Sequence, residues 1–242
     1  MEYSAAFKAG LCLHLRILIG FALILSAKSM CSEIEALGYQ TIIARDEISC
    51  VSSNGVWLVD CCIPCESNQF ASGAVLEEGL VFSNLYSAVS RVMMDTAIFR
   101  ILPGVYMGIY NCNINVQVSA SQMIGVCGPL YTTINCNNSL SHLRVTNTGA
   151  SFELNGVTLI NGFNGENGGC ISINGPGAMI TLVDVKLLNC VSHKSGGAIS
   201  MYNIDLSYFS VSTMISIKGK SRIENCSAKL NGGALYLLVG ST

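Results

Sequence analysis

The chain has 242 residues and a net charge of −2 at pH 7, with only 12% charged and 50% hydrophobic residues. This balance, together with 24 glycines, excludes a disordered chain, because disorder needs high charge and low hydrophobicity. The sequence has no basic block, so we expect no nucleic-acid partner, since binding to phosphates needs clustered Lys and Arg.

Residues 1–29 have the pattern of a secretory signal peptide. Lys8 and Arg16 precede the apolar run ILIGFALIL (17–25), which suits a signal-peptide core and is too short to span a bilayer. Small residues follow in AKS (27–29), where we expect cleavage. The alternative is an uncleaved membrane anchor. The signal segment predicts a secreted or cell-surface protein.

Cysteines are concentrated in the next segment, residues 30–79, whose fold the sequence leaves open. They are Cys31, Cys50, Cys61, Cys62 and Cys65. A secretory route allows disulfides. Removal of Cys12 with the signal segment leaves 11 of the 12 cysteines, so at least one is a free thiol or bridges to another chain. The motif CIPC (62–65) has zinc-site spacing at one end only, so we expect a disulfide rather than a metal site.

A helix and a series of short strands are predicted from residue 80 onward. The segment 84–94 places Leu85, Val89, Val92 and Met93 on one helical face. Strand-like runs broken by turn residues follow at 97–106, 114–119, 123–128, 132–138 and 151–162. A stack of coils needs its first coil covered, so we expect the helix to act as a cap, although an ordinary core helix would pack in nearly the same way.

One motif then occurs three times: an Asn followed seven residues later by the start of a Gly pair. The asparagines are Asn161, Asn189 and Asn225. The pairs are Gly168-Gly169, Gly196-Gly197 and Gly232-Gly233. The unit length is 28 and then 36 residues, and repeats of this size indicate stacked architectures in which one unit cannot bury its apolar face alone.

Each unit holds two predicted strands, one before the Asn and one after the Gly pair. Apolar residues alternate in both, as in Val157 and Leu159 and in Ile171 and Ile173. Equivalent strands of successive units run in the same direction, and parallel strands need long connections. The consistent solution is a coil in which each unit makes one circuit about 4.8 Å above the last.

Stacking explains the choice of residues in the motif. An Asn that lies above the Asn of the neighbouring coil can donate to one neighbour and accept from the other, which forms a ladder. Asn also tolerates the left-handed conformation of a sharp turn, and the Gly pair lets the backbone bend where a side chain would clash. The alternative is that these Asn and Gly residues only mark ordinary loops. Three occurrences at identical spacing argue against it.

The third unit departs from the pattern. Its strand before the Asn is polar (217–222), its upstream apolar positions slip by one, and we place its eight extra residues around 202–211. Cys190 and Cys226 hold equivalent positions with a Cα separation of about 4.8 Å, which a disulfide can bridge. We favour instead a stack of small apolar side chains.

The helix before TAIFRILPGVY (96–106) and the short-strand coils that follow it resemble the pectin-lyase-like right-handed β-helix. Within that fold, the units GGCI, GGAI and GGAL (168–171, 196–199 and 232–235), with their asparagines, look like the repeats of chlamydial polymorphic outer-membrane proteins. Members of that family often carry Phe three residues before the Asn, where this chain has Thr158, Lys186 and Arg222.

The resemblance implies an all-β fold, a right-handed parallel β-helix with an N-terminal capping helix, over residues 80–242. In that family the repeats form a surface-exposed and often adhesive passenger domain. We expect the domain to be incomplete at its C-terminus, because an uncovered last coil would expose strand edges that are open to aggregation.

The same fold hosts polysaccharide lyases and glycoside hydrolases, whose chemistry needs carboxylates close together. Two acids would meet if they held equivalent positions in neighbouring coils. Glu153 aligns with Thr181 and Ile217, and Asp184 with Gly156 and Lys220. Glu166 aligns with Lys194 and Leu230, and Glu224 with Ile160 and Leu188. No acid pair stacks, and Glu166 with Lys194 predicts only a weak surface ion pair.

Other candidates for chemistry are isolated. His142 and His193 lie on predicted turns, where we expect solvated side chains rather than catalysis, and Asp205 lies on the extra loop of the third unit. The Asp-Asp and Gly-His-Gly motifs of polygalacturonases do not occur. We therefore expect no catalytic residue, no cofactor and no metal.

The leading hypothesis is a secreted or cell-surface, non-catalytic β-helix that serves as a structural or adhesive module. Its partner would be an extracellular glycan or protein, and it would meet a membrane only through the signal segment or a missing C-terminal region. The alternative is a carbohydrate-active enzyme, a polysaccharide lyase or glycoside hydrolase of the same fold. A third hypothesis is a degenerate or truncated product without a function of its own.

Overall fold

The computed structural model describes residues 35–36, 55–58, 61–65, 74–77, 80–91, 96–117, 120–203 and 213–239. The expected signal segment and Asp205 lie outside these residues. The chain divides into two compact units, Met1–Pro64 and Cys65–Thr242. In the first unit, β1 (Gly55–Leu58) and β2 (Cys61–Pro64) form an antiparallel pair.

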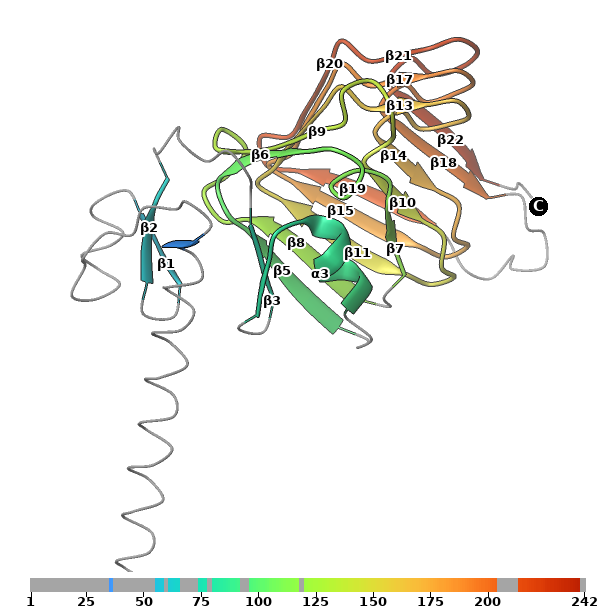
Figure 1. The fold of residues 1–242 in the computed structure, drawn as a ribbon. Helices are drawn as coiled ribbons and strands as arrows, with labels where there is room; N and C mark the ends of the chain where they lie inside the picture. Colours follow the sequence, from blue (N-terminus) through green and yellow to red (C-terminus); the bar gives the residue numbers. More distant parts are fainter. Residues whose placement is uncertain are drawn as a thin grey trace, which may run out of the picture. The chain divides into compact units, whose positions relative to one another are not determined.

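The second unit is a parallel β-solenoid, which confirms the predicted stack of coils (Figure 1). Its largest sheet contains, in spatial order, β19 (Met214–Lys218), β15 (Met179–Val183), β11 (Ser151–Asn155), β8 (Ala120–Gly125), β5 (Thr96–Ile101), β3 (Val75–Glu77) and β4 (Leu80–Phe82). All neighbours from β19 to β5 pair in parallel, whereas β3 pairs antiparallel with both β5 and β4.

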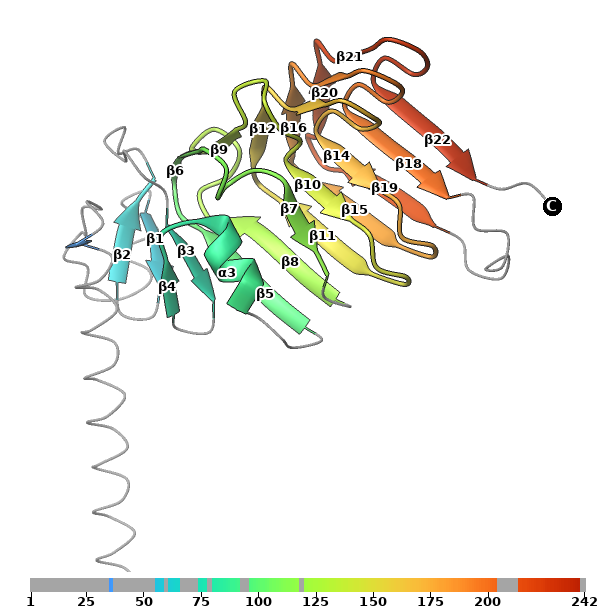
Figure 2. The ribbon, with the colours of Figure 1, turned by 45° about the vertical axis from the view of Figure 1, so that its right-hand side comes forward.

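Three further sheets contribute to the circuits, and Figure 2 shows strands of the two five-stranded sheets side by side. One contains β22 (Leu235–Val239), β18 (Ile199–Asn203), β14 (Ile171–Ile173), β10 (Leu143–Val145) and β7 (Ile114–Val116). Another contains β20 (Arg222–Glu224), β16 (Lys186–Leu188), β12 (Thr158–Ile160), β9 (Thr132–Asn135) and β6 (Gly104–Met107). The smallest contains β13 (Phe163–Asn164), β17 (Val191–Ser192) and β21 (Ser227–Ala228).

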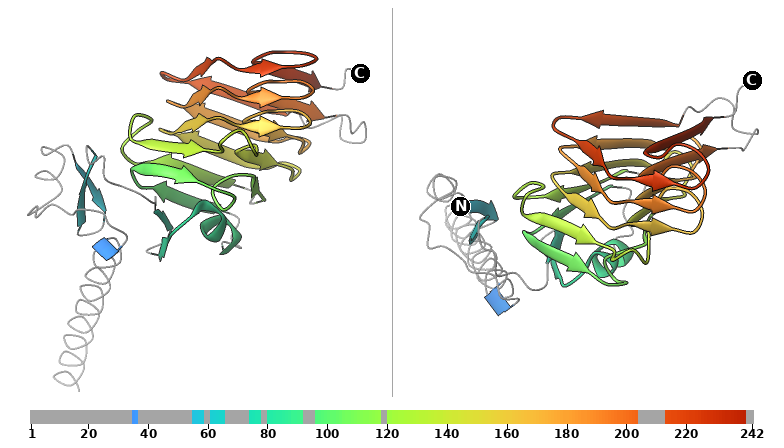
Figure 3. Two further views of the ribbon diagram at one scale, coloured as in Figure 1. Left: turned by 45° about the horizontal axis from the view of Figure 1, so that its top comes forward. Right: turned by 90° about the horizontal axis from the view of Figure 1, so that it is seen from above.

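The apolar alternation in the sequence fills the inside of the coils. In the largest sheet, Phe99, Met123, Leu154 and Leu182 are buried and pair in register from strand to strand, which makes a column of side chains along the stack. Burial of one such side chain is worth about 1.5–3 kcal/mol. The stack of coils, seen from two further directions in Figure 3, is therefore held together by its continuous interior.

Helix α3 (Leu85–Arg91) is shorter than the predicted segment 84–94. Asn84 caps its N-terminus, because the Asn84 Oδ1 accepts a hydrogen bond from the Ser87 backbone N–H at 2.8 Å. Leu85 and Ala88 are buried, and Val89 packs against the core as a half-buried residue. The predicted apolar positions Val92 and Met93 lie outside the described residues.

The strand register locates the extra residues of the third unit. Ile173 and Met179 are six residues apart, whereas their partners Met201 and Met214 are thirteen apart, so seven extra residues lie where the sequence predicted them. The eighth lies before β20, because Val183 and Lys186 are three residues apart and their partners Lys218 and Arg222 are four apart. This single extra residue accounts for the predicted slip of the apolar positions.

None of the helices among the described residues combines the length and the hydropathy that crossing a membrane requires.

Candidate functional site

The repeated asparagines lie in register on successive coils. Asn161, Asn189 and Asn225 have positive φ angles of 56°, 52° and 52°, so each occupies the left-handed conformation that its turn requires. The Asn189 Nδ2 donates to the Asn161 Oδ1 at 3.3 Å, and the Asn161 Nδ2 donates to the Asn135 Oδ1 at 3.1 Å. The sequence motif did not include Asn135, which is in register with Ile160, one position before that of Asn161.

The two glycines of each pair have different roles. The first ones, Gly168, Gly196 and Gly232, have φ angles of 74°, 69° and 60°, which favour glycine. The second ones of the first two pairs, Gly169 and Gly197, meet the neighbouring coil closely. A Cβ added to Gly169 would lie 2.6 Å from both the backbone N and the backbone O of Val191, so this position has no room for any side chain.

A second polar column was missed by sequence reasoning. The residue immediately before each Gly pair is Asn167, Ser195 or Asn231. The Asn167 Oδ1 accepts the Ser195 backbone N–H at 3.0 Å, and the Asn231 Nδ2 donates to the Ser195 Oγ at 3.5 Å. Alignment of the position before the Gly pairs would have found it.

The position of His142 corrects the sequence expectation, because this side chain is buried rather than solvated. His142 immediately precedes β10. It is in register with Cys170, which follows the Gly pair of the next coil, and this position faces inward. Its Nε2 lies 3.0 Å from the Ile134 carbonyl oxygen and 3.2 Å from that of Ile160, so Nε2 carries the proton. Burial lowers the pKa of His142 to about 4, although the two carbonyl contacts act to raise it.

Gly162 makes the room that His142 needs. A Cβ added to Gly162 would lie 2.8 Å from the His142 Nδ1 and 2.6 Å from the Cys170 Sγ. The Nδ1 has no hydrogen-bond partner. An imidazole that is enclosed in this way supports packing, and we assign it no catalytic role. The other histidine, His193, is exposed and packs edge-on against the Phe163 ring, with centroids 4.9 Å apart.

Three disulfides are present among the described cysteines: Cys65–Cys127, Cys112–Cys136 and Cys170–Cys190. Cys65 of the CIPC motif therefore pairs with a residue outside that motif. Because Cys190 is bonded to Cys170, it forms no bridge with Cys226, and neither the bridge nor the apolar stack that we favoured included this pairing. Cys226 is a half-buried free thiol whose Sγ lies 3.4 Å from the Cys190 backbone N, and burial raises its pKa.

The acidic side chains lie mostly where the alignment put them. Glu153 pairs in register with Thr181, as predicted, but the next residue in the row is Ser216 rather than Ile217. The prediction was wrong because it counted back from Asn225 without the extra residue between Lys218 and Arg222. The Glu166 carboxylate forms an ion pair with the Lys194 Nζ, and both side chains are at least half exposed.

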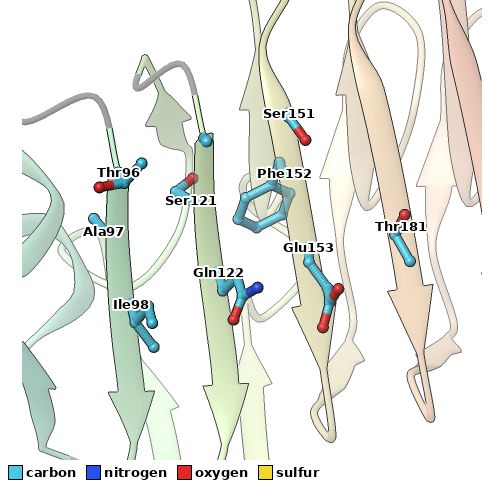
Figure 4. A pocket seen from close by; sticks show the side chains of 10 residues that line it. Thr96, Ala97, Ile98, Ser121, Gln122, Ser151, Phe152, Glu153 and Thr181 are labelled. Atoms are coloured by element: carbon cyan, nitrogen blue, oxygen red, sulfur yellow. The ribbon is translucent and has the colours of Figure 1, made fainter.

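A hollow of about 250 Å³ lies along the first residues of β5, β8 and β11 in the largest sheet (Figure 4), and its lining includes buried as well as more exposed side chains. Ile98, Gln122, Glu153 and Thr181 pair in register across β5, β8, β11 and β15 and line it. The neighbours of Glu153 within this row are the neutral side chains of Gln122 and Thr181. Apart from the apolar Ile98, the row therefore offers hydrogen-bond donors and acceptors at the spacing of the strands, with one carboxylate among them. We call it the sheet groove.

A larger hollow of about 440 Å³ lies where the chain turns from the largest sheet to the sheet that contains β16 and β20. We call it the corner groove. It is lined by the cations Lys186, Lys220 and Arg222, the carboxylate of Asp184, and apolar and glycine residues that include Pro129 and Leu130. The sequence did not suggest this groove, because its residues come from four coils and share no motif.

The described residues contain no group of three or more His, Cys, Asp or Glu side chains that could hold a metal ion. No protein-family model, no curated protein and no solved structure matches the chain.

Proposed function

We propose that this protein is a secreted or cell-surface β-helix that acts as a structural or adhesive module without catalysis. The observation that carries the proposal is the sheet groove, in which polar side chains stand at the same position of neighbouring strands. A row of this kind is a repetitive surface, such as solenoids use to bind extended partners.

The cysteine pairs support the proposed location. Three disulfides in the second unit are compatible with an extracellular location, because such bonds persist in oxidising compartments. The apolar run within 1–29 agrees with export as a signal segment. We retain the resemblance to the pectin-lyase-like right-handed β-helix and to the polymorphic outer-membrane repeats as part of this proposal, with α3 as the cap of the first coil.

The test separates this function from the carbohydrate-active alternative. The protein is incubated with polygalacturonate with and without calcium, and the products are assayed for unsaturated and reducing ends. We expect none beyond a sample without protein. Release of either product by the protein, but not by its Glu153→Gln variant, would assign an enzyme and overturn the proposal. Glu153→Gln is the matched control because it removes the carboxylate of the sheet groove and keeps the size of the side chain.

A further inference from the structure

The corner groove concentrates positive charge on a chain that is slightly acidic overall. Three of the 13 Lys and Arg residues line it, against one carboxylate among the described lining residues. That carboxylate is already engaged, because the Asp184 Oδ1 accepts the Lys220 backbone N–H at 2.6 Å. The Arg222 Nη1 lies 3.9 Å from the Glu224 Oε1, an exposed and therefore weak ion pair.

The strand register places like charges beside each other in this groove. Lys186 of β16 and Arg222 of β20 are direct partners in adjacent parallel strands, about 4.8 Å apart. Like charges in directly opposed positions destabilise a sheet. An anion that sits between them would relieve this repulsion, and it would form charge-assisted hydrogen bonds with both side chains.

The groove extends over four coils, and its other end, at Pro129 and Leu130, is apolar and held in place. Leu130 is 73% exposed, and Pro129 adjoins it. The Thr158 Oγ1 donates to the Pro129 carbonyl oxygen at 2.6 Å, and the disulfide between Cys127 and Cys65 fixes the same loop. A preorganised wall lowers the entropy cost of binding.

Glycine backbone also lines the groove. Gly125 and Gly156 pack so closely that a Cβ on Gly156 would lie 2.8 Å from the Gly125 carbonyl oxygen. The coils therefore pack closely at this point, where the lining offers backbone rather than side chains. None of the described lining residues is an aromatic platform on which a nucleobase could stack.

We infer that the corner groove binds an acidic glycan, with Lys186, Lys220 and Arg222 on its carboxylate or sulfate groups and Pro129 and Leu130 against the apolar face of a sugar ring. This inference rests on the proposed binding function and names its ligand class. Sulfated and carboxylated chains share the required chemistry. A neutral glycan would offer these three cations no anionic group.

The test is retention of the full chain on immobilised heparin, polygalacturonate and dextran, which represent sulfated, carboxylated and neutral chains. The groove variant is Lys186→Gln, Lys220→Gln, Arg222→Gln. The matched control is Arg100→Gln, Arg144→Gln, Lys229→Gln, which removes three exposed cations outside the lining and gives the same net charge. We expect at least one anionic column to retain the original chain and the control, with retention that falls as salt is added. Neither protein should be retained on dextran.

The groove variant should bind at least about tenfold more weakly, because charged hydrogen bonds are lost. The anionic column that retains the original chain more strongly identifies the source of the anionic group. Equal weakening of both triple variants, binding to dextran, or no binding by the original chain would overturn the inference. Arg222→Gln alone, an exposed position, keeps the test valid if the triple variant does not fold. Depolymerisation of polygalacturonate would instead contradict the proposed function, so the two failures are distinguishable.

Discussion

The side-chain amide of Asn189 donates a hydrogen bond to the Oδ1 of Asn161, which occupies the same turn of the neighbouring coil, at 3.3 Å. Both residues have positive φ angles. One side chain thus meets two demands of the repeat: it bonds to the next coil, and it accepts a backbone conformation that most residues avoid.

These two demands can be separated by substitution of Asn189. Asn189→Gly keeps the left-handed backbone and loses the hydrogen bond, so we expect a loss of less than about 1 kcal/mol in the free energy of unfolding. Asn189→Ala loses both and should cost about 2 kcal/mol, because Ala is strained at positive φ. Urea unfolding measures both variants. An equal loss in the two would show that backbone conformation does not govern this position.

The second glycine of the first two pairs should tolerate no side chain. Gly169→Ala would bring a Cβ within 2.6 Å of the Val191 backbone, so the neighbouring coils would have to separate, at a cost of at least about 3 kcal/mol. Gly165→Ala in the same loop is the control, because a Cβ there would meet nothing within 4 Å. Thermal unfolding should show a large fall in Tm for Gly169→Ala only. Similar Tm values for the two would contradict the close packing of the coils.

Acid should destabilise the fold through His142. Burial lowers the pKa of His142 from 6.5 to about 4 in the folded state. Between these pH values, His142 is protonated in the unfolded chain and neutral in the folded chain. Stability should therefore be unaffected by His142 above pH 6.5 and fall by about 2–3 kcal/mol as the pH drops towards 4.

His142→Gln removes this titration and is the comparison that isolates it. Other acids contribute to both proteins alike, so the measurement is the difference between the two stability curves in urea from pH 7 to 4.5. We expect the free energy of unfolding of the original protein to fall steadily relative to that of the variant below pH 6.5. Parallel curves over this range would rule out the buried neutral imidazole.

The Cys170–Cys190 disulfide joins residues 20 apart in sequence. Its removal should lower the free energy of unfolding by about 3 kcal/mol, because the unfolded chain gains conformational entropy. The variant is Cys170→Ala, Cys190→Ala, in which the alanine that replaces Cys170 would match Ala198 of the next coil. Cys226→Ala is the control, because Cys226 forms no bridge, and it should change Tm little. If Cys226→Ala lowered Tm as much as the double variant, the assigned pairing would be wrong.

Much of the stack could be predicted from the three Asn and Gly motifs. Their spacing gave the parallel arrangement of β12, β16 and β20 and the register between Glu166 and Lys194. The surroundings of His142 could not be read in this way, because its coil lacks the Gly pair that would have aligned it with Cys170. The corner groove escaped prediction because side chains from separate coils form it only after the coils have stacked.

The constant and the variable parts of the repeat lie at different corners of the coil. From β12 to β14, β16 to β18 and β20 to β22, the last residue of one strand and the first of the next are always 11 positions apart, as in Ile160 and Ile171 or Leu188 and Ile199. Between Val116 and Ala120 there are four positions, whereas between Met201 and Met214 there are thirteen, and both ends remain in register with their neighbours. That corner accepts changes of length without disturbing the strands around it, and it is therefore where new loops could be gained in evolution or grafted by design.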